Sequence, residues 1–137
     1  DWHPVDHCSF REQGGNWPPH CIANTPGAGF AEGLRLPRSC RVVSKALDAD
    51  REAYSGFMGT DLEHQLRRAG VGRVFIGGLA TDYCVLNTVR DARACGFDTY
   101  LLTDAIRAVN VHSGDGQKAL DEMLRQGAHP VTLESVE

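Results

Sequence analysis

Residues 73–85 read Arg-Val-Phe-Ile-Gly-Gly-Leu-Ala-Thr-Asp-Tyr-Cys-Val, and this stretch decides the fold. The unbroken apolar run at residues 74–76 predicts a short parallel strand that is buried on both faces. A glycine pair ends the strand. Thr81 or Asp82 can then cap a helix whose apolar residues recur at helical spacing until Gly96.

Cys84 falls in the first turn of this predicted helix. Free backbone N–H groups and the positive end of the helix dipole favour a thiolate there, and the thiolate is the nucleophilic form of cysteine. A buried cysteine that packs as a small hydrophobic residue is the alternative interpretation. Cys84 and Cys95 cannot form a disulfide on one helix, because about 16 Å would separate them.

Strands and helices alternate on either side of this stretch. The sequence predicts further strands at residues 41–47, 97–103 and 131–133, helices at 60–69, 82–95 and 116–125, and a loop or short helix at 104–109. The helix at 60–69 should begin with a capping box formed by Thr60 and Glu63. This alternation predicts an α/β fold with three layers, in which helices cover both faces of a mostly parallel sheet.

The composition is that of an ordinary globular protein. The 137 residues are 42% hydrophobic and 23% charged, which suits one domain, and the net charge of −4 gives no basic footprint for nucleic acid. No stretch approaches the roughly 20 apolar residues of a membrane helix. Five dispersed cysteines favour reduced thiols, so we expect a soluble cytoplasmic protein. The sequence is also compatible with a homo-oligomer.

The first 20 residues contain a carboxylate and three imidazoles in a spaced pattern. Asp1, His3, His7 and His20 follow the spacing D-x-H-x3-H-x12-H. Donors of these types suit zinc, iron or manganese. Surface histidines near a chain end would give the same pattern. The cysteines next to His7 and His20 would instead favour a closed structural zinc site.

Two further side chains allow two interpretations each. Lys45 lies among apolar neighbours in the predicted strand at 41–47. A partner carboxylate or thiolate would offset the cost of burying its ammonium, and a lysine at an exposed strand end is the alternative. Trp17 lies in a loop rich in glycine and proline, where its ring either stacks on a flat ligand or anchors the loop.

Taken together, these motifs resemble the isochorismatase-like cysteine hydrolases and, within that family, the nicotinamidases. The motifs that match occur in the family's order at residues 1–4 with 6–7, 17–21, 54–57, 78–85 and 104–105. The resemblance implies the isochorismatase-like fold and a metal-dependent amidohydrolase that converts nicotinamide to nicotinate and ammonia. One alternative is a relative that hydrolyses carbamoyl, ureido or enol-ether substrates, although such relatives generally do not need the metal motif. The other alternative is a non-catalytic zinc-binding domain.

The resemblance also implies roles in catalysis. Cys84 would attack the amide carbon and form a thioester acyl-enzyme, and Lys45 would be its triad partner. The bond between Leu79 and Ala80 matches a position that is usually cis in the family. This bend would direct the backbone N–H groups of Ala80 and Cys84 at the developing oxyanion.

The ligand and pocket residues follow from the same resemblance. Asp1, His3 and His20 match the metal ligands of the family, and His7 matches a more variable ligand position. One divalent metal ion, zinc first with iron or manganese as alternatives, would bind the pyridine nitrogen and so orient the ring. The residues that match the substrate pocket are Trp17, Tyr54, Leu79 and Tyr83.

Two features depart from the family's pattern. The third catalytic residue of the family, an Asp that acts as general base and acid, lies on a first strand upstream of the metal motif, and this chain begins after it. The family's lysine is usually followed by glycine, whereas Ala46 follows Lys45 here. We therefore expect residues 1–137 to be one N-terminally incomplete domain that exposes a sheet face and edge and hydrolyses nicotinamide poorly.

Overall fold

The computed structural model describes residues 1–136, and the chain forms two compact units, Asp1–Ala53 and Tyr54–Glu137. The first unit consists mostly of loops, and the second contains the regular helices and strands. None of the helices in the described chain is long and apolar enough to cross a membrane. The single domain expected from the sequence stays a prediction.

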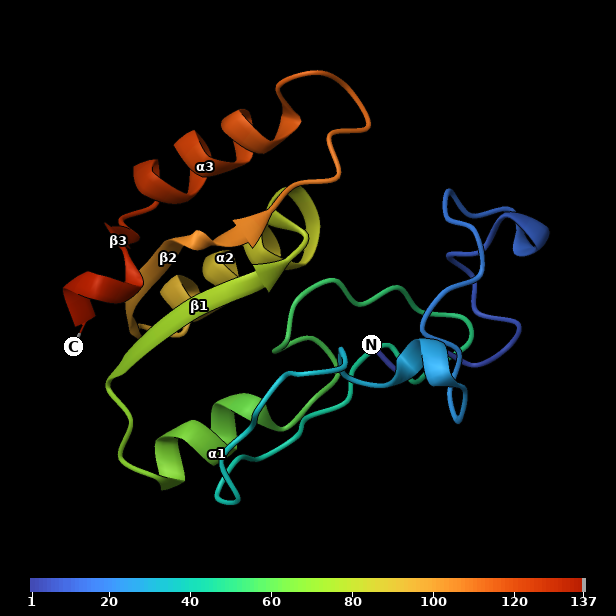
Figure 1. Ribbon diagram of the computed structural model, residues 1–137, viewed down its shortest axis with the longest axis horizontal. Coiled ribbons are helices and arrows are strands. Elements are labelled where there is room, and N and C mark those ends of the chain that lie inside the picture. Colours follow the sequence, from blue (N-terminus) through green and yellow to red (C-terminus); the bar gives the residue numbers. More distant parts are fainter. Residues whose placement is uncertain (137) are drawn as a thin grey trace. The chain divides into compact units, whose positions relative to one another are not determined.

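The second unit is built on a parallel sheet of three strands in the order β1-β2-β3. The strands are β1 (Arg73–Leu79), β2 (Asp98–Arg107) and β3 (His129–Val131), and the helices are α1 (Leu62–Arg68), α2 (Leu86–Ala94) and α3 (Asp115–Arg125) (Figure 1). A π-helical turn, η3 (Thr81–Val85), precedes α2, and a 3-10 helix, η4 (Leu133–Val136), follows β3. The α/β class with a parallel sheet, expected from the sequence, is confirmed.

One face of this sheet carries the hydrophobic core of the unit. Ile76 of β1 and Leu101 of β2 are paired in register, and both are buried. Val89 of α2 and Met123 of α3 belong to the same core, and Leu66 of α1 packs against it. Burial of a side chain of this size contributes about 1.5–3 kcal/mol, so the apolar core holds the helices on the sheet.

The opposite face of the sheet carries a row of aromatic side chains. Phe75 pairs with Tyr100 across β1 and β2, and the rings of Tyr100 and His129 are also adjacent, each pair at 5.0 Å between centroids. Phe75 is 46% exposed. The described helices of this unit therefore pack on the face of the sheet that carries the core.

The second strand is longer than the sequence predicted. Residues 104–107 continue β2 instead of forming a loop or short helix. Ile106 and Arg107 pair with Gly78 and Leu79 after an irregularity in the register. Because β1 supplies backbone partners as far as Leu79, β2 can extend alongside it even where its sequence turns polar.

Smaller differences affect the ends of other elements. The last strand lies at His129–Val131, two residues earlier than expected, and residues 133–136 are helical. Helix α1 starts after Asp61, and the expected capping box at Thr60 is absent. The Thr60 hydroxyl instead accepts a hydrogen bond from the N–H of Leu62 and donates one to the carbonyl of Gly56.

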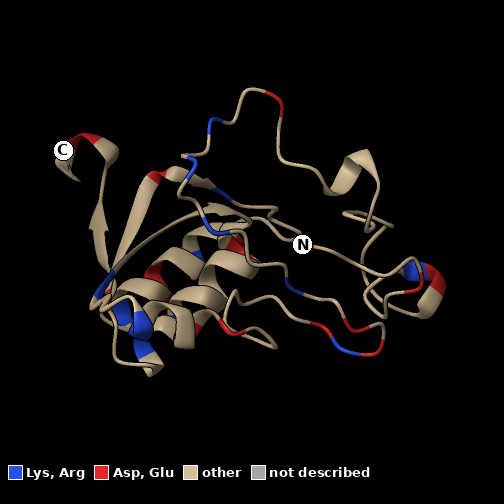
Figure 2. Ribbon diagram, turned by 90° about the horizontal axis from the view of Figure 1, so that it is seen from below, with Lys and Arg blue, Asp and Glu red and all other residues tan. Residues whose placement is uncertain are grey.

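Charged residues of both signs are interspersed on the helices of the second unit (Figure 2). Glu63 and Arg67 form an ion pair on α1, and Asp115 and Lys118 form one on α3. Such exposed pairs contribute little to stability, so the apolar core remains the main source of order in this unit.

The first unit has two short 3-10 helices, η1 (Arg11–Gln13) and η2 (Pro26–Ala28), and two isolated parallel bridges, His3 with Ile22 and Phe10 with Trp17. The strand expected at residues 41–47 does not form. The carbonyl of Lys45 accepts a hydrogen bond from the N–H of Trp2 at 3.1 Å, but no second ladder bond follows among the described residues. An apolar β-forming sequence remains irregular when no partner strand lies alongside it.

Candidate active site and metal-binding group

Cys84 lies in the π-helical turn η3, at the carboxyl end of β1. The sequence placed it in the first turn of an α-helix, and this detail is wrong. The carbonyl of Ala80 accepts hydrogen bonds from the N–H groups of Tyr83 at 3.1 Å and Val85 at 3.0 Å, and the second of these is the wide bond of a π-turn. Thr81 and Val85 bury their side chains at the two ends of the turn, which leaves Cys84 half-buried between them.

The backbone just before this turn has the form that the resemblance implied. The peptide bond between Leu79 and Ala80 is cis. Gly78 has a φ of 114°, a conformation that residues with a side chain rarely adopt, so the bend depends on glycine at this position. The Leu79 side chain is mostly exposed.

Two tyrosines predicted to line a pocket lie together in the second unit. The rings of Tyr54 and Tyr83 are 5.4 Å apart, and Tyr83 is the residue directly before Cys84. Burial, followed by the charges of Asp82 and Asp115, raises the pKa of the Tyr83 phenol, which therefore stays neutral at physiological pH. A neutral phenol can donate a hydrogen bond to a substrate.

In the first unit, Asp1, His3 and His20 form a group that could hold a metal ion. Each offers one ligand atom, and these atoms lie within 4.8 Å of one another. The distance between His3 Nε2 and Asp1 Oδ2 is 4.0 Å. Two atoms that each bind zinc at about 2.0–2.2 Å can be up to about 4.4 Å apart. Small side-chain rotations would therefore bring all three residues to coordination distance.

His3 has the properties of a ligand that lacks its partner. Its side chain is 3% exposed, and neither ring nitrogen has a hydrogen-bond partner. A buried polar atom in this state costs roughly 1–3 kcal/mol. Burial, with smaller contributions from His7 and His20, lowers the pKa of His3 to about 4. The imidazole is thus neutral at pH 7, and a lone pair is available for a metal ion.

His20 is oriented by a backbone carbonyl. Its Nδ1 lies 2.8 Å from the carbonyl oxygen of Pro18. When Nδ1–H donates this hydrogen bond, the lone pair is on Nε2, which is the usual arrangement of a metal-binding histidine. The ring of Trp17 lies 6.4 Å from the ring of His20.

His7 does not join this group, although the resemblance gave it a variable ligand position. Its Nδ1 lies 2.7 Å from the Ser9 hydroxyl, and its Nε2 lies 3.1 Å from the carbonyl of Arg51. Both nitrogens are therefore engaged by protein atoms, and the ring is fully buried. This geometry makes His7 a residue that joins two loops, and we leave it out of the proposed ligand set.

The sequence gave no indication that Phe10 packs against these histidines. Phe10 is fully buried, and its ring lies 5.5 Å from the rings of His3 and His20 and 5.8 Å from that of His7. An aromatic residue seven positions after His3, near no other hydrophobic run, has no periodic signal that would have identified it.

Neither Cys8 nor Cys21 belongs to the potential metal-binding group in the described chain. Burial, then the charge of Glu52, raises the pKa of the Cys8 thiol. A closed structural zinc site needs thiolates, which this environment disfavours. The alternative of a structural zinc site with cysteine ligands therefore has no support from the described residues.

Lys45 has the paired environment that the sequence offered as one of two interpretations. Its ammonium forms an ion pair with Asp1 Oδ1 and donates a hydrogen bond to the carbonyl of Ala53 at 2.8 Å. The Lys45 side chain is 14% exposed. Ala46, which replaces the family's glycine, has a φ of 55°. The substitution thus retains a left-handed backbone that glycine adopts more easily.

Comparison with known proteins gives consistent results. The model of the isochorismatase domain family matches residues 2–135. The nicotinamidase/pyrazinamidase of Mycobacterium tuberculosis is 39% identical to this chain over 131 residues, which cover 90% of this chain and 68% of that protein.

Two solved structures share the fold. The pyrazinamidase of Pyrococcus horikoshii in complex with zinc is 50% identical, with a TM-score of 0.90 over 96% of this chain and 72% of that one. PnC1 of L. infantum in complex with nicotinate is 35% identical, with a TM-score of 0.91 over 98% and 70% of the two chains. The isochorismatase-like fold expected from the sequence is confirmed. This chain therefore belongs to the isochorismatase family, as a nicotinamidase-like hydrolase.

Proposed function

We propose that this protein hydrolyses nicotinamide to nicotinate and ammonia, with Cys84 as nucleophile and a metal ion bound by Asp1, His3 and His20. The observation that carries the proposal is the convergence of these three donors around a buried His3 whose ring nitrogens lack partners. The resemblance associates this motif with nicotinamidases rather than with relatives that act on carbamoyl or ureido compounds. The zinc complex and the nicotinate complex of the two solved relatives support the same choice.

The proposed reaction proceeds through two acyl-transfer steps. The Cys84 thiolate attacks the amide carbon, and the negative charge moves to the carbonyl oxygen. The N–H groups of Ala80 and Cys84 stabilise this oxyanion, and each such donor is worth about 3–4 kcal/mol. A carboxylic acid, in the general acid and base role that the resemblance assigns to an Asp, protonates the amide nitrogen, so the C–N bond breaks and ammonia leaves. The carboxylate formed then takes a proton from the water of the second step. Water attacks the resulting thioester and releases nicotinate and the thiolate.

Residues of the first unit would bind and orient the substrate. A zinc ion, or iron or manganese in its place, would supply a Lewis-acidic position for the pyridine nitrogen. His20 is already oriented for such an ion by Pro18, and His3 is neutral and buried. Lys45 supplies the positive charge that the resemblance assigns to the reacting thiolate, and Trp17 supplies a flat surface for a ring.

The test measures metal content and ammonia release in the full-length natural protein. We expect close to one equivalent of metal per chain and turnover of nicotinamide in the ordinary enzyme range of about 1–10³ s⁻¹. His20→Ala should lose the metal and most of the activity. The matched control is His64→Ala, because His64 is an exposed histidine on α1.

Two results would overturn the proposal. One is full nicotinamide turnover by protein from which a chelator has removed all metal. The other is faster release of ammonia from carbamoyl or ureido compounds than from nicotinamide, which would indicate a different branch of the family.

A further inference from the structure

Asp82 connects two loops that follow neighbouring strands. Its Oδ1 accepts a hydrogen bond from the N–H of Val109 at 3.0 Å, and its Oδ2 accepts one from the N–H of Asn110 at 2.8 Å. Asp82 belongs to the turn η3 after β1, and the two donors follow the end of β2. Because Leu79 and Arg107 are paired at the ends of these strands, both loops start at the same edge of the sheet.

The loop after β2 is itself fixed at its far end. Asn110 has a φ of 55°, and its Oδ1 accepts a hydrogen bond from the N–H of Gly116 in α3 at 2.8 Å. A Cβ atom on Gly116 would lie 2.5 Å from the Cβ of Ala108, so this contact requires glycine. Asp82 therefore ties the turn that carries Cys84 to a loop that α3 holds in place.

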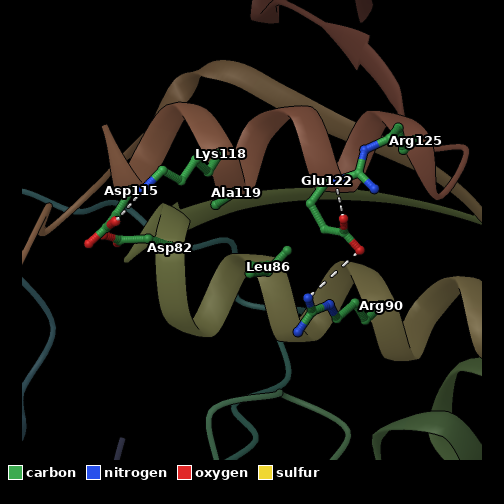
Figure 3. A pocket seen from close by; sticks show the side chains of 8 residues that line it. All are labelled: Asp82, Leu86, Arg90, Asp115, Lys118, Ala119, Glu122 and Arg125. Carbon is green, nitrogen blue, oxygen red and sulfur yellow. Dashed lines mark hydrogen bonds and ion pairs between the residues drawn. The ribbon is translucent and has the colours of Figure 1, made fainter. Parts of the chain in front are cut away.

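The contacts of Asp82 differ from those of the other acids nearby. A groove of about 410 Å³ lies between α2 and α3, with Asp82 at one end beside Asp115 (Figure 3). Within it, Glu122 pairs with Arg90 and Arg125. Asp82 instead directs both oxygens at backbone N–H groups of another loop. These charge-assisted hydrogen bonds are the stronger kind, and two of them fix the side chain in one orientation.

We propose that Asp82 is a positioning residue for Cys84. By holding η3 against the loop after β2, it fixes where the thiol and the backbone N–H of Cys84 stand relative to the substrate carbonyl. The inference rests on the proposed function, because it concerns the same nucleophile. A displacement of about 1 Å in a reacting group costs on the order of 10²-fold in rate, so a small movement of this turn suffices for a large effect.

The test compares Asp82→Asn with Asp115→Asn. An Asn at position 82 has one carbonyl oxygen and an NH₂ group that cannot accept, so one of the two hydrogen bonds is lost. Asp115 is a matched control because its carboxylate also accepts a hydrogen bond from a backbone N–H, that of His112 at 2.8 Å. Its charge, like that of Asp82, acts on Tyr83, but no described hydrogen bond joins it to η3.

Three measurements are made on each variant. For Asp82→Asn we expect kcat for nicotinamide, per titrated Cys84 thiol, to fall about 10- to 100-fold with a smaller change in KM. Alkylation of Cys84 by iodoacetamide should slow at neutral pH. The amide hydrogens of Val109 and Asn110 should exchange faster. Asp115→Asn should leave all three within about twofold of the natural protein.

Specific results would overturn the inference. If Asp82 contributes only to stability, Asp82→Asn should lower the Tm and leave kcat and the alkylation rate per folded molecule unchanged. A purely electrostatic role predicts faster alkylation of Cys84, because a negative charge near the thiolate is removed. If Asp82→Asn does not fold, Asp82→Glu serves instead. It keeps both acceptors on a longer side chain, so the two amides should stay protected while kcat still falls, and an unchanged kcat contradicts the inference.

The alkylation and exchange measurements need no substrate. They report on Asp82 even when nicotinamide is not turned over, in which case the proposed function fails and the positioning role of Asp82 is still decided.

Discussion

The two units of this chain hold their functional side chains in place by different means. In the second unit, Cys84 follows a strand that is packed by Ile76, Leu101 and other apolar residues into one continuous core. In the first unit, where regular structure is limited to short 3-10 helices and isolated bridges, the histidines are placed by individual polar contacts such as His7 with Ser9.

This difference shows that a loop can fix the positions of side chains as well as a sheet can. An apolar core tolerates small changes because its contacts are many and non-directional. A loop held by hydrogen bonds depends on each partner, because a buried donor or acceptor that loses its partner costs roughly 1–3 kcal/mol. Mutations in the first unit should therefore weaken metal binding as well as stability, whereas mutations in the second unit should affect folding or the chemistry without weakening metal binding.

The largest expected effect comes from Cys84→Ala, which tests whether the regular unit carries the chemistry. Loss of a nucleophile costs on the order of 10⁶-fold in kcat in a well-studied protease, and we expect a loss of nicotinamide hydrolysis on that scale. Thermal unfolding should show a nearly unchanged Tm. Cys95→Ala at the end of α2 is the control and should keep its activity. Residual activity near that of the control would mean that another residue is the nucleophile.

A second pair of variants compares the units directly. Phe10 and Met123 are both fully buried, one in each unit. Replacement by Ala should lower the free energy of unfolding by about 3–5 kcal/mol for Phe10 and about 2–5 kcal/mol for Met123. Phe10→Ala should also weaken metal binding, because Phe10 packs against the rings of His3 and His20.

Urea unfolding and metal titration of the folded variants make this comparison. Equal weakening of metal binding by Met123→Ala would show that the two units respond as one, and the distinction drawn above would then be wrong.

The alkylation rates of individual thiols give a further comparison of the two units, with a smaller expected effect. Burial raises the pKa of Cys8 in the first unit and of Cys95 in the second, so both thiols are protonated at neutral pH. We expect iodoacetamide to label Cys84 on the order of tenfold faster than either, as measured by peptide mass spectrometry. Raising the pH should reduce this difference as Cys8 and Cys95 lose their protons. Faster labelling of Cys8 at pH 7 would contradict the assignment of Cys84.

Ala46→Gly should have the smallest effect. The left-handed backbone of Ala46 costs about 1–2 kcal/mol, and glycine removes this cost. Glycine also adds about 0.5–1 kcal/mol of conformational entropy cost, and the buried methyl group is lost. The free energy of unfolding should therefore change by less than about 1 kcal/mol, and metal affinity should not change. A loss of metal binding would show that the backbone at this residue controls the ion pair of Lys45.

The sequence predicted those features that depend on local chemistry. The apolar run and glycine pair around Gly78 predicted β1 and the bend after it. The spacing of Asp1, His3 and His20 anticipated their convergence. The first pattern is local, and the bridge between His3 and Ile22 brings the residues of the second pattern together.

The errors concern features that depend on distant partners. Residues 41–47 have β-forming side chains, but whether a strand forms depends on a neighbouring strand that the sequence does not reveal. The role of His7 is decided by the hydroxyl of Ser9 and the carbonyl of Arg51, a residue 44 positions away. Asp82 looked like a helix cap, and its actual partners are 27 and 28 positions further along the chain.

The carboxylate of Asp1 has a consequence for how this protein can evolve. One of its oxygens pairs with Lys45, and the other faces His3. Asn at this position would keep an oxygen for the metal group but remove the charge that the lysine needs, and Glu would keep the charge but displace it by one methylene. A single mutation at position 1 thus cannot improve one partnership without harming the other. Among natural homologues, positions 1 and 45 should therefore change together or stay as they are.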